Sequence, residues 1–308
     1  MKAEFENICR KSQKKLKKYV KNKLMETHDE VISDNGFVYA QGKFPVLLVA
    51  HMDTVHKELP TTILHDGDNI SSPNGIGGDD RCGIYMILEI IKKHHCSVLF
   101  CEDEEIGMVG AEKFIKTELA KSLVGQFNYI IEFDRRGSND AVFYDCANEE
   151  FEEFITREFY KTEWGSFSDI STIAPFLETA AVNLSCGYYR AHTKDEYVVF
   201  SEMETSMKQA MKILSRTTDE KFEYIPERYS YNYGYGYGYG YDVYDYEMYG
   251  SGYYIFDYIS EKGGEDFYET HAGSKAEAIG MFCMDNPLCC YGDIIDVYYE
   301  GDDMYESL

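Results

Sequence analysis

The segment PVLLVAHMDTV, residues 45–55, places a histidine and an aspartate directly after a run of apolar residues. A short, continuous apolar run is typical of a strand that is buried on both faces of a parallel sheet. His51 and Asp53 then follow the carboxyl end of that strand, where open α/β sheets have their binding crevice. This segment therefore indicates both the fold class and the place of a functional site.

Similar units of strand, polar loop and helix follow along the chain. The apolar runs SVLFC (residues 97–101) and YIIEF (residues 129–133) lead to Glu104 and Asp134, and amphipathic spacing follows Asp79. Buried strands that alternate with amphipathic helices predict a three-layer α/β/α domain around a mostly parallel, mixed sheet. In such a sheet, the loops at one edge bring together side chains that are distant in sequence.

Local patterns predict further elements. An Asp34-Asn35-Gly36 turn within alternating residues predicts a hairpin at residues 30–41. Apolar residues at helical spacing predict helices at residues 4–24, 84–91, 111–119 and 198–216.

The composition changes abruptly after residue 217. Residues 229–241 (YSYNYGYGYGYGY) place tyrosine at every second position, mostly alternating with glycine. This pattern predicts a flexible linker whose tyrosines support self-association, with a strand bearing one aromatic face as the alternative. Strand and helix patterns resume at residue 253. We expect a main domain at residues 1–217, a Tyr/Gly-rich linker at 218–252 and a small α+β module at 253–308.

The charge balance bears on possible partners. The formal net charge is −25 at pH 7, which argues against nucleic acid because phosphate binding needs a basic surface. The one basic stretch, KSQKKLKKYVKNK at residues 11–23, is typical of a solvated helix face, with a docking patch as the alternative.

Targeting signals and cysteine usage indicate a compartment. The first residues lack the apolar core of a signal peptide, and the longest apolar runs are too short to span a bilayer. The nine cysteines show no disulfide spacing, which favours reduced thiols. We therefore expect a cytoplasmic protein without a membrane segment.

Imidazoles and carboxylates recur in the loops that follow these strands. Mixed imidazole and oxygen ligands bind pairs of divalent metals, and a spare carboxylate beside them can act as a base. Each short motif alone is weak evidence, but their joint occurrence predicts a two-metal hydrolase acting on amide bonds. The residues concerned are His51, Asp53, Asp79, Asp80, Glu104, Glu105, Asp134 and His192.

Five segments give the chain a resemblance to the zinc-dependent exopeptidase and deacylase superfamily, which includes the M20, M28 and M42 metallopeptidases. The first segment is most similar to M20 members and the second to M42 members, and the resemblance covers residues 40–215. The segments are LLVAHMDTV (47–55), GIGGDDRCGI (75–84), CEDEEIGMVGA (101–111), YIIEFDRRG (129–137) and NLSCGYYRAHTKDEYV (183–198).

The resemblance implies a site for two divalent ions, with zinc as the default and cobalt or manganese as alternatives for such ligands. It implies that Asp79 bridges the two ions. His51 and Asp134 would complete one site, and Glu105 and His192 the other.

The resemblance also implies two catalytic roles. Glu104 would be the general base, taking a proton from a metal-bound water and passing it to the leaving amine. Asp53 would accept a hydrogen bond from the His51 ring and fix its tautomer. Members of the superfamily often have a cis peptide after the bridging aspartate, which predicts a cis bond between Asp79 and Asp80.

One departure from the M20 pattern concerns the lid domain that M20 enzymes insert between two metal ligands. Here 192 − 134 = 58 positions separate the matching residues, Asp134 and His192. That length suffices for a strand, a helix and a strand, so we expect the lid to be absent.

Three functions remain open from the sequence. The first is an aminopeptidase or small-peptide hydrolase with a peptide substrate. The second is an amidohydrolase that deacylates N-acyl amino acids. The third is a non-catalytic scaffold that retains the fold, which the intact set of ligands disfavours.

Overall fold

A computed structural model describes most of the chain, which divides into two compact units, Met1–Ile225 and Pro226–Leu308. The described residues are 2–157, 159–165, 167–216, 221–226, 252–259, 265–272, 278, 281–282, 286 and 294–301.

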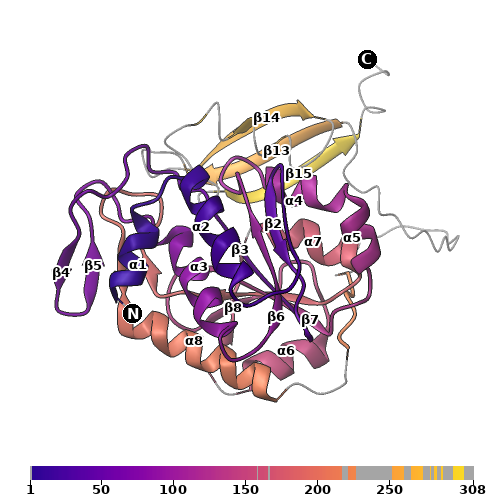
Figure 1. The fold of residues 1–308 in the computed structure, drawn as a ribbon. Coiled ribbons are helices and arrows are strands. Elements are labelled where there is room, and N and C mark those ends of the chain that lie inside the picture. Colours follow the sequence, from indigo (N-terminus) through magenta and orange to yellow (C-terminus); the bar gives the residue numbers. More distant parts are fainter. Residues whose placement is uncertain are drawn as a thin grey trace, which may run out of the picture. The chain divides into compact units, whose positions relative to one another are not determined.

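The first unit is built around an eight-stranded mixed sheet with the order β1-β2-β6-β3-β7-β10-β8-β9 (Figure 1). Its four central strands, β6, β3, β7 and β10, run parallel to one another. The prediction of a mostly parallel, mixed sheet is therefore confirmed. The strands are β1 (Val31–Asp34), β2 (Phe37–Ala40), β3 (Phe44–His51), β6 (Cys96–Cys101), β7 (Tyr129–Arg135), β8 (Asp140–Val142), β9 (Lys161–Thr162) and β10 (Ala181–Ser185).

Helices cover both faces of this sheet, which completes the three layers (Figure 1). One core cluster joins alternate residues of the central strands to the buried faces of α1 (Lys2–Cys9), α2 (Gln13–Met25), α3 (Gly78–Ile90), α6 (Glu149–Thr156) and α8 (Phe200–Ser215). On the other face, α7 contacts β3, β7 and β10, and α4 contacts β2. The helices of this layer are α4 (Val109–Ile115), α5 (Glu118–Leu123) and α7 (Asp169–Leu177).

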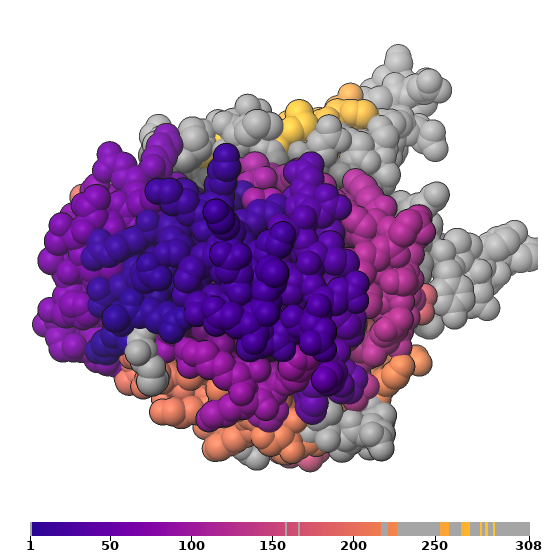
Figure 2. Space-filling model, viewed as in Figure 1, coloured from indigo at the N-terminus to yellow at the C-terminus, as the bar shows by residue number. Residues whose placement is uncertain are grey.

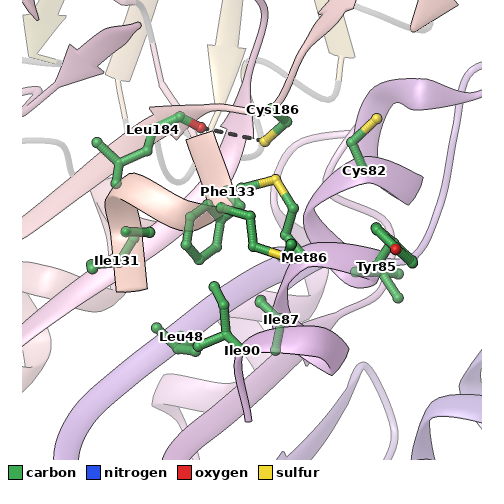
Figure 3. Packing of buried hydrophobic residues seen from close by; sticks show 14 of the residues in the cluster. Leu48, Cys82, Tyr85, Met86, Ile87, Ile90, Ile131, Phe133, Leu184 and Cys186 are labelled. Atoms are coloured by element: carbon green, nitrogen blue, oxygen red, sulfur yellow. Dashed lines mark hydrogen bonds between the residues drawn. The ribbon is translucent and has the colours of Figure 1, made fainter. Parts of the chain in front are cut away.

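The packing between α3 and the sheet explains why the central strands are apolar throughout. Ile87 and Ile90 of α3 lie close to Leu48 of β3, and all three side chains are fully buried (Figure 3). Burying one such side chain stabilises the fold by about 1.5–3 kcal/mol. This packing holds the last turn of α3 against the sheet.

A small second sheet joins two loops of the first unit. Its order is β11-β12-β5-β4, from β4 (Leu64–Asp66), β5 (Asn69–Ser71), β11 (Tyr188–Tyr189) and β12 (Tyr197–Val199). Tyr197 of β12 pairs with Ser71 of β5 in antiparallel register. The loop that contains His192 therefore lies beside the loop that leads to Asp79.

The predicted helix at residues 4–24 is divided in two, α1 and α2, by a break at residues 10–12. Ser12 is extended there, with φ −64° and ψ 154°. Buried Cys9 and Leu16 are seven positions apart in the sequence, which is about two turns of an unbroken helix. The apolar pattern therefore gives no sign of the break. In the space-filling view, these N-terminal residues (indigo) lie on the face turned to the reader (Figure 2).

Other predicted elements agree more closely with the structure. The hairpin pairs Asp34 with Phe37, and Gly36 in its turn has a φ of 98°, which favours glycine. The last predicted helix is α8. The helix predicted at residues 111–119 is instead α4 and α5, because Thr117 accepts a hydrogen bond from the amide of Ala120 and caps a new helix.

Between Asp134 and His192 the described residues form no inserted domain. They contain β8, α6, β9, α7, β10 and β11, which is one helix and two strands more than predicted.

The first unit extends beyond position 217. The Phe222 amide donates a hydrogen bond to the Asn128 carbonyl, and the Phe222 carbonyl accepts one from the Ala180 amide. The Phe222 ring packs against Tyr129 and Phe151. These contacts attach the segment after α8 to the edge of the core.

The second unit contains a three-stranded antiparallel sheet with the order β14-β13-β15. Tyr254, Phe256 and Tyr258 of β13 alternate to one buried side, and Phe282 stacks on Phe256. The strands are β13 (Gly252–Ile259), β14 (Glu265–Ala272) and β15 (Ile294–Gly301). The Tyr/Gly-rich segment at residues 229–241 lies outside the described residues, so its role in self-association stays a prediction.

None of the described helices combines the length and apolar character needed to cross a membrane. Six cysteines of the first unit are buried free thiols: Cys9, Cys82, Cys96, Cys101, Cys146 and Cys186.

Substitution of a central core residue should reveal how much stability the sheet contributes. Leu48→Ala removes a fully buried side chain and should lower the free energy of unfolding by about 2–5 kcal/mol. The matched control, Leu64→Ala, changes a side chain that is 48% exposed and should cost at most about 0.5 kcal/mol. Urea unfolding measures both, and equal losses would contradict this placement of the core.

Candidate metal centre

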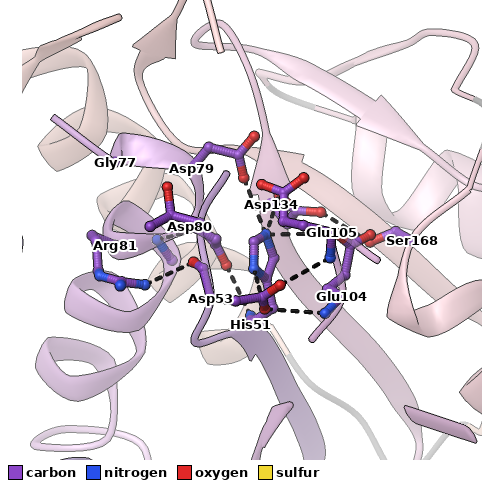
Figure 4. Close-up of polar contacts among 12 residues, drawn as sticks. His51, Asp53, Gly77, Asp79, Asp80, Arg81, Glu104, Glu105, Asp134 and Ser168 are labelled. Atoms are coloured by element: carbon purple, nitrogen blue, oxygen red, sulfur yellow. Dashed lines mark hydrogen bonds and ion pairs between the residues drawn. The ribbon is translucent and has the colours of Figure 1, made fainter. Parts of the chain in front are cut away.

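The five predicted metal ligands converge at the carboxyl ends of the central strands. Figure 4 labels four of them: His51, Asp79, Glu105 and Asp134. Asp79 lies between the two imidazoles. Its Oδ1 is 3.1 Å from Nε2 of His51, and its Oδ2 is 3.0 Å from Nε2 of His192. Asp134 lies 3.4 Å from the His51 ring, and Glu105 lies 3.1 Å from the His192 ring.

These contacts form two groups that share one carboxylate. His51, Asp79 and Asp134 bring one ligand atom each within 4.8 Å of one another, and so do Asp79, Glu105 and His192. Such sharing is the arrangement that a bridging aspartate between two cations requires.

The start of α3 gives Asp79 its position. Gly77 caps the helix with φ 68° and ψ 40°, a left-handed conformation that glycine adopts without steric cost. Asp79 is not helical, with φ −80° and ψ 105°, and the Asp79–Asp80 bond is cis as predicted. The carboxylate of Asp80 accepts hydrogen bonds from the amides of His51 and Gly83, which ties α3 to β3.

Asp53 connects the first imidazole to the two glutamates. Its Oδ1 lies 3.2 Å from Nδ1 of His51, and its two oxygens accept hydrogen bonds of 3.0 Å from the amides of Glu104 and Glu105. If Nδ1 donates to Asp53, the lone pair on Nε2 faces Asp79. Asp53 thus orients the His51 ring and fixes the backbone of both glutamates.

Asp134 is held by three neighbours outside the predicted set of ligands. Ser168 donates to its Oδ2 at 3.0 Å and Tyr188 to its Oδ1 at 3.3 Å. The Asn183 side chain accepts from the Asp134 amide and donates to its carbonyl. Only the position of Ser168 within a loop next to α7 hints at such a role.

A buried arginine supports the loop that contains Asp53. The Arg81 guanidinium is almost fully buried and donates to the carbonyls of Met52, at 2.6 Å, and Asp53, at 2.8 Å. It also donates to the carbonyl of Lys11, so the break between α1 and α2 contacts the same side chain.

Helix α2 also supports the loop that leads to Glu104. Lys17 pairs with Glu102 at 2.5 Å, and Gln13 donates to Asp103 at 2.8 Å. Glu102 further accepts a hydrogen bond from the amide of Gly36. The N-terminal helices are therefore connected to the centre by specific side chains.

Burial governs the charge state of the carboxylates. It raises the pKa of Glu104 well above its usual range, with further repulsion from Asp134 and Glu105. Burial also raises the pKa of Glu105 and of Asp134. For Asp79, burial is outweighed by hydrogen bonds to His192 and His51, which hold its pKa below the usual range.

The residues fit divalent metal ions. Two imidazoles and several carboxylates match the mixed nitrogen and oxygen ligands of such sites. The Oε1 atom of Glu105 is buried and has no hydrogen-bond partner among the described residues. A buried carboxylate oxygen without a partner is costly unless a cation contacts it.

Comparison with known proteins gives a family match. The model of peptidase family M28 matches residues 38–179. No curated protein sequence gives a significant match.

Several solved structures share the fold. An aminopeptidase PepT from Bacillus cereus superposes with a TM-score of 0.57 and 14% identity, over 69% of this chain and 96% of that chain. A tripeptidase from Staphylococcus aureus gives 0.54 and 15%, over 69% and 97%. A Zn-dependent exopeptidase from Parabacteroides distasonis gives 0.52 and 13%, over 70% and 95%. At these identities the likeness establishes the fold.

Zinc should stabilise the protein more near pH 8 than near pH 6. Burial alone would lower the pKa of His51, but Asp134, Asp53 and Asp79 raise it well above its usual value. With the pKa values of Glu105 and Asp134 also raised, bound protons compete with the metal as the pH falls. For each proton that the metal must displace, the affinity for zinc falls about tenfold when the pH falls by one unit. Thermal unfolding with Zn²⁺ or with a chelator measures the shift, and equal shifts at both pH values would contradict the ligand set.

Proposed function

We propose, on the premise that this chain belongs to the zinc-dependent exopeptidase superfamily, that it is an aminopeptidase or small-peptide hydrolase with two metal ions. The M28 match and the fold support a metallopeptidase. The two-metal site and the role of Glu104 are the further content of the proposal.

The observation that supports two ions is the position of Asp79. Each of its carboxylate oxygens contacts a different imidazole, on His51 and on His192. Each imidazole has a second carboxylate beside it, from Asp134 and from Glu105. A site for one ion, formed by either group, would leave two of these five side chains without a role.

Zinc is the metal we propose. Imidazole nitrogen and carboxylate oxygen suit Zn²⁺, and the same set of ligands accepts Co²⁺ or Mn²⁺. Two bound ions would polarise the scissile carbonyl and lower the pKa of water towards neutrality.

Glu104 is the residue we assign as the general base. Its Oε2 lies 3.9 Å from Nε2 of His51, which places it at the centre without a hydrogen bond to that ring. It takes a proton from the attacking water and delivers it to the leaving amine. Burial, which raises its pKa, makes it a stronger base than an exposed glutamate, and Asp53 holds its backbone amide.

A second candidate is the deacylation of N-acyl amino acids, which requires the same chemistry at the amide. The two activities differ in what the substrate presents next to the scissile bond. Release of amino acids from unblocked dipeptides and aminoacyl-anilides supports the peptidase. Activity confined to N-acylated compounds would support the deacylase instead.

Glu104→Gln should reduce turnover by about 100- to 10,000-fold, because a carboxamide cannot accept the proton. The metal content should remain near two ions per chain, because Glu104 is not among the proposed ligands. Hydrolysis of aminoacyl-anilides and elemental analysis of the purified protein measure the two quantities.

A matched control for that variant is Glu112→Gln, which changes a glutamate of the neighbouring helix α4 that pairs with Lys116. It should retain most of the turnover. Full activity in Glu104→Gln would remove Glu104 from the base role, and a wild type without bound metal would end the proposal.

We also propose that residues 226–308 lie outside the catalytic unit and that the Tyr/Gly-rich segment supports self-association. All proposed ligands and Glu104 lie within the first compact unit. The buried free thiols suit a reducing compartment such as the cytoplasm.

A chain that ends at Ile225 should therefore bind the same number of metal ions and hydrolyse the same substrates as the full chain. In sedimentation it should form smaller assemblies than the full chain at equal concentration. Loss of metal binding on truncation would contradict the division, and unchanged assembly would contradict self-association through the segment.

A further inference from the structure

We propose that Glu196, supported by His56, is a positioning residue that fixes the bridging aspartate of the metal centre. This inference rests on the proposed function, because it assigns a role towards the same two ions. Neither Glu196 nor His56 belongs to the set of ligands or contacts the reacting atoms.

The Glu196 carboxylate is fully buried and binds the loop that precedes α3. Its Oε2 accepts a hydrogen bond of 2.7 Å from the amide of Gly77, and its Oε1 accepts one of 3.0 Å from the amide of Asp79. The two oxygens thus hold two backbone amides that are two residues apart. They fix the backbone from which the Asp79 side chain projects.

His56 completes the environment of this carboxylate. Its Nε2 lies 2.7 Å from Oε2 of Glu196, and the His56 side chain is 10% exposed. Buried carboxylate oxygens need such hydrogen-bond donors in place of water. The ring fills the space above Gly75, where an added Cβ would lie 2.1 Å from its Cε1 atom. The loop and the pair therefore fit one another closely.

The same glutamate connects Asp79 and His192, two of the three ligands of one metal group. Glu196 ends the turn that contains His192, and its own amide donates to the carbonyl of Thr193. Its carboxylate reaches the Asp79 amide, while the carboxylate of Asp79 contacts the His192 ring. The distance between Asp79 and His192 therefore depends on Glu196.

A carboxamide cannot replace this carboxylate. Both amides are fixed donors, one on each oxygen of Glu196. In Glu196→Gln, either orientation of the side chain turns its NH₂ group towards one of these N–H groups. One amide is then left buried without an acceptor, and the loop must shift.

The test is calorimetric titration of the metal-free full chain with Zn²⁺ alone. We expect two binding events in the wild type. Glu196→Gln should weaken the second event by about 10- to 100-fold, the usual effect of losing a residue that orients metal ligands. The zinc concentration for half-maximal hydrolysis should rise by the same factor, while kcat at saturating zinc returns towards the wild-type value.

Two variants of His56 separate positioning from general damage to the fold. His56→Leu keeps the carboxylate but removes its donor, so the second event should weaken by a smaller factor. His56→Gln places an NH₂ group near the position of Nε2 and should restore most of the affinity. These variants decide the inference even if Glu196→Gln does not fold.

Asn148→Ala is the matched control for stability. Asn148 caps α6 and donates to the carbonyl of Glu223, so its loss should destabilise the fold while leaving both zinc affinities unchanged. If Glu196→Gln and His56→Leu bound zinc as tightly as the wild type, this inference would be overturned, while the proposed function would stand. A wild type that binds no zinc would overturn the proposed function as well.

Discussion

The carboxylate of Asp79, shared between the rings of His51 and His192, is the interaction on which the rest of the site depends. Several acidic groups are buried around it, and like charges in a poorly solvated space repel one another. The arrangement is stable only where positive charge compensates them and where the backbone prevents them from moving apart. The hydrogen bonds that Asp53 and Glu196 accept from backbone amides meet the second requirement. They are made by residues that lie outside the proposed set of ligands.

The parts of the fold that could be predicted are those with a local signal. The apolar run before His51 predicted β3 because burial on both faces of a parallel strand selects apolar residues at every position. The order of the loops then indicated which polar side chains meet, since parallel strands end at the same edge. The break at Ser12 could not be predicted, because the apolar residues keep one helical phase on both sides of it.

The supporting side chains had no such signal. The hydrogen bonds between Glu196 and the loop before α3 join residues more than a hundred positions apart, and they depend on the pairing of β12 with β5. The contact of Ser168 with Asp134 likewise requires α7 to lie next to β7. Glu196 follows His192 by four residues, so the sequence places it near the site. Its burial, however, is a property of the folded chain alone.

The contacts of the N-terminal helices show that residues outside the stretch matched by the family model also support the site. Residues 38–179, the stretch shared with the M28 model, omit Lys17 and Gln13, which brace the loop before Glu104. They also omit His192 at the other end. A fragment trimmed to the recognisable stretch would thus keep most of the sheet yet lose one imidazole and the braces of the acidic loop. The stretch that the family model matches is therefore shorter than the stretch whose hydrogen bonds hold the site together.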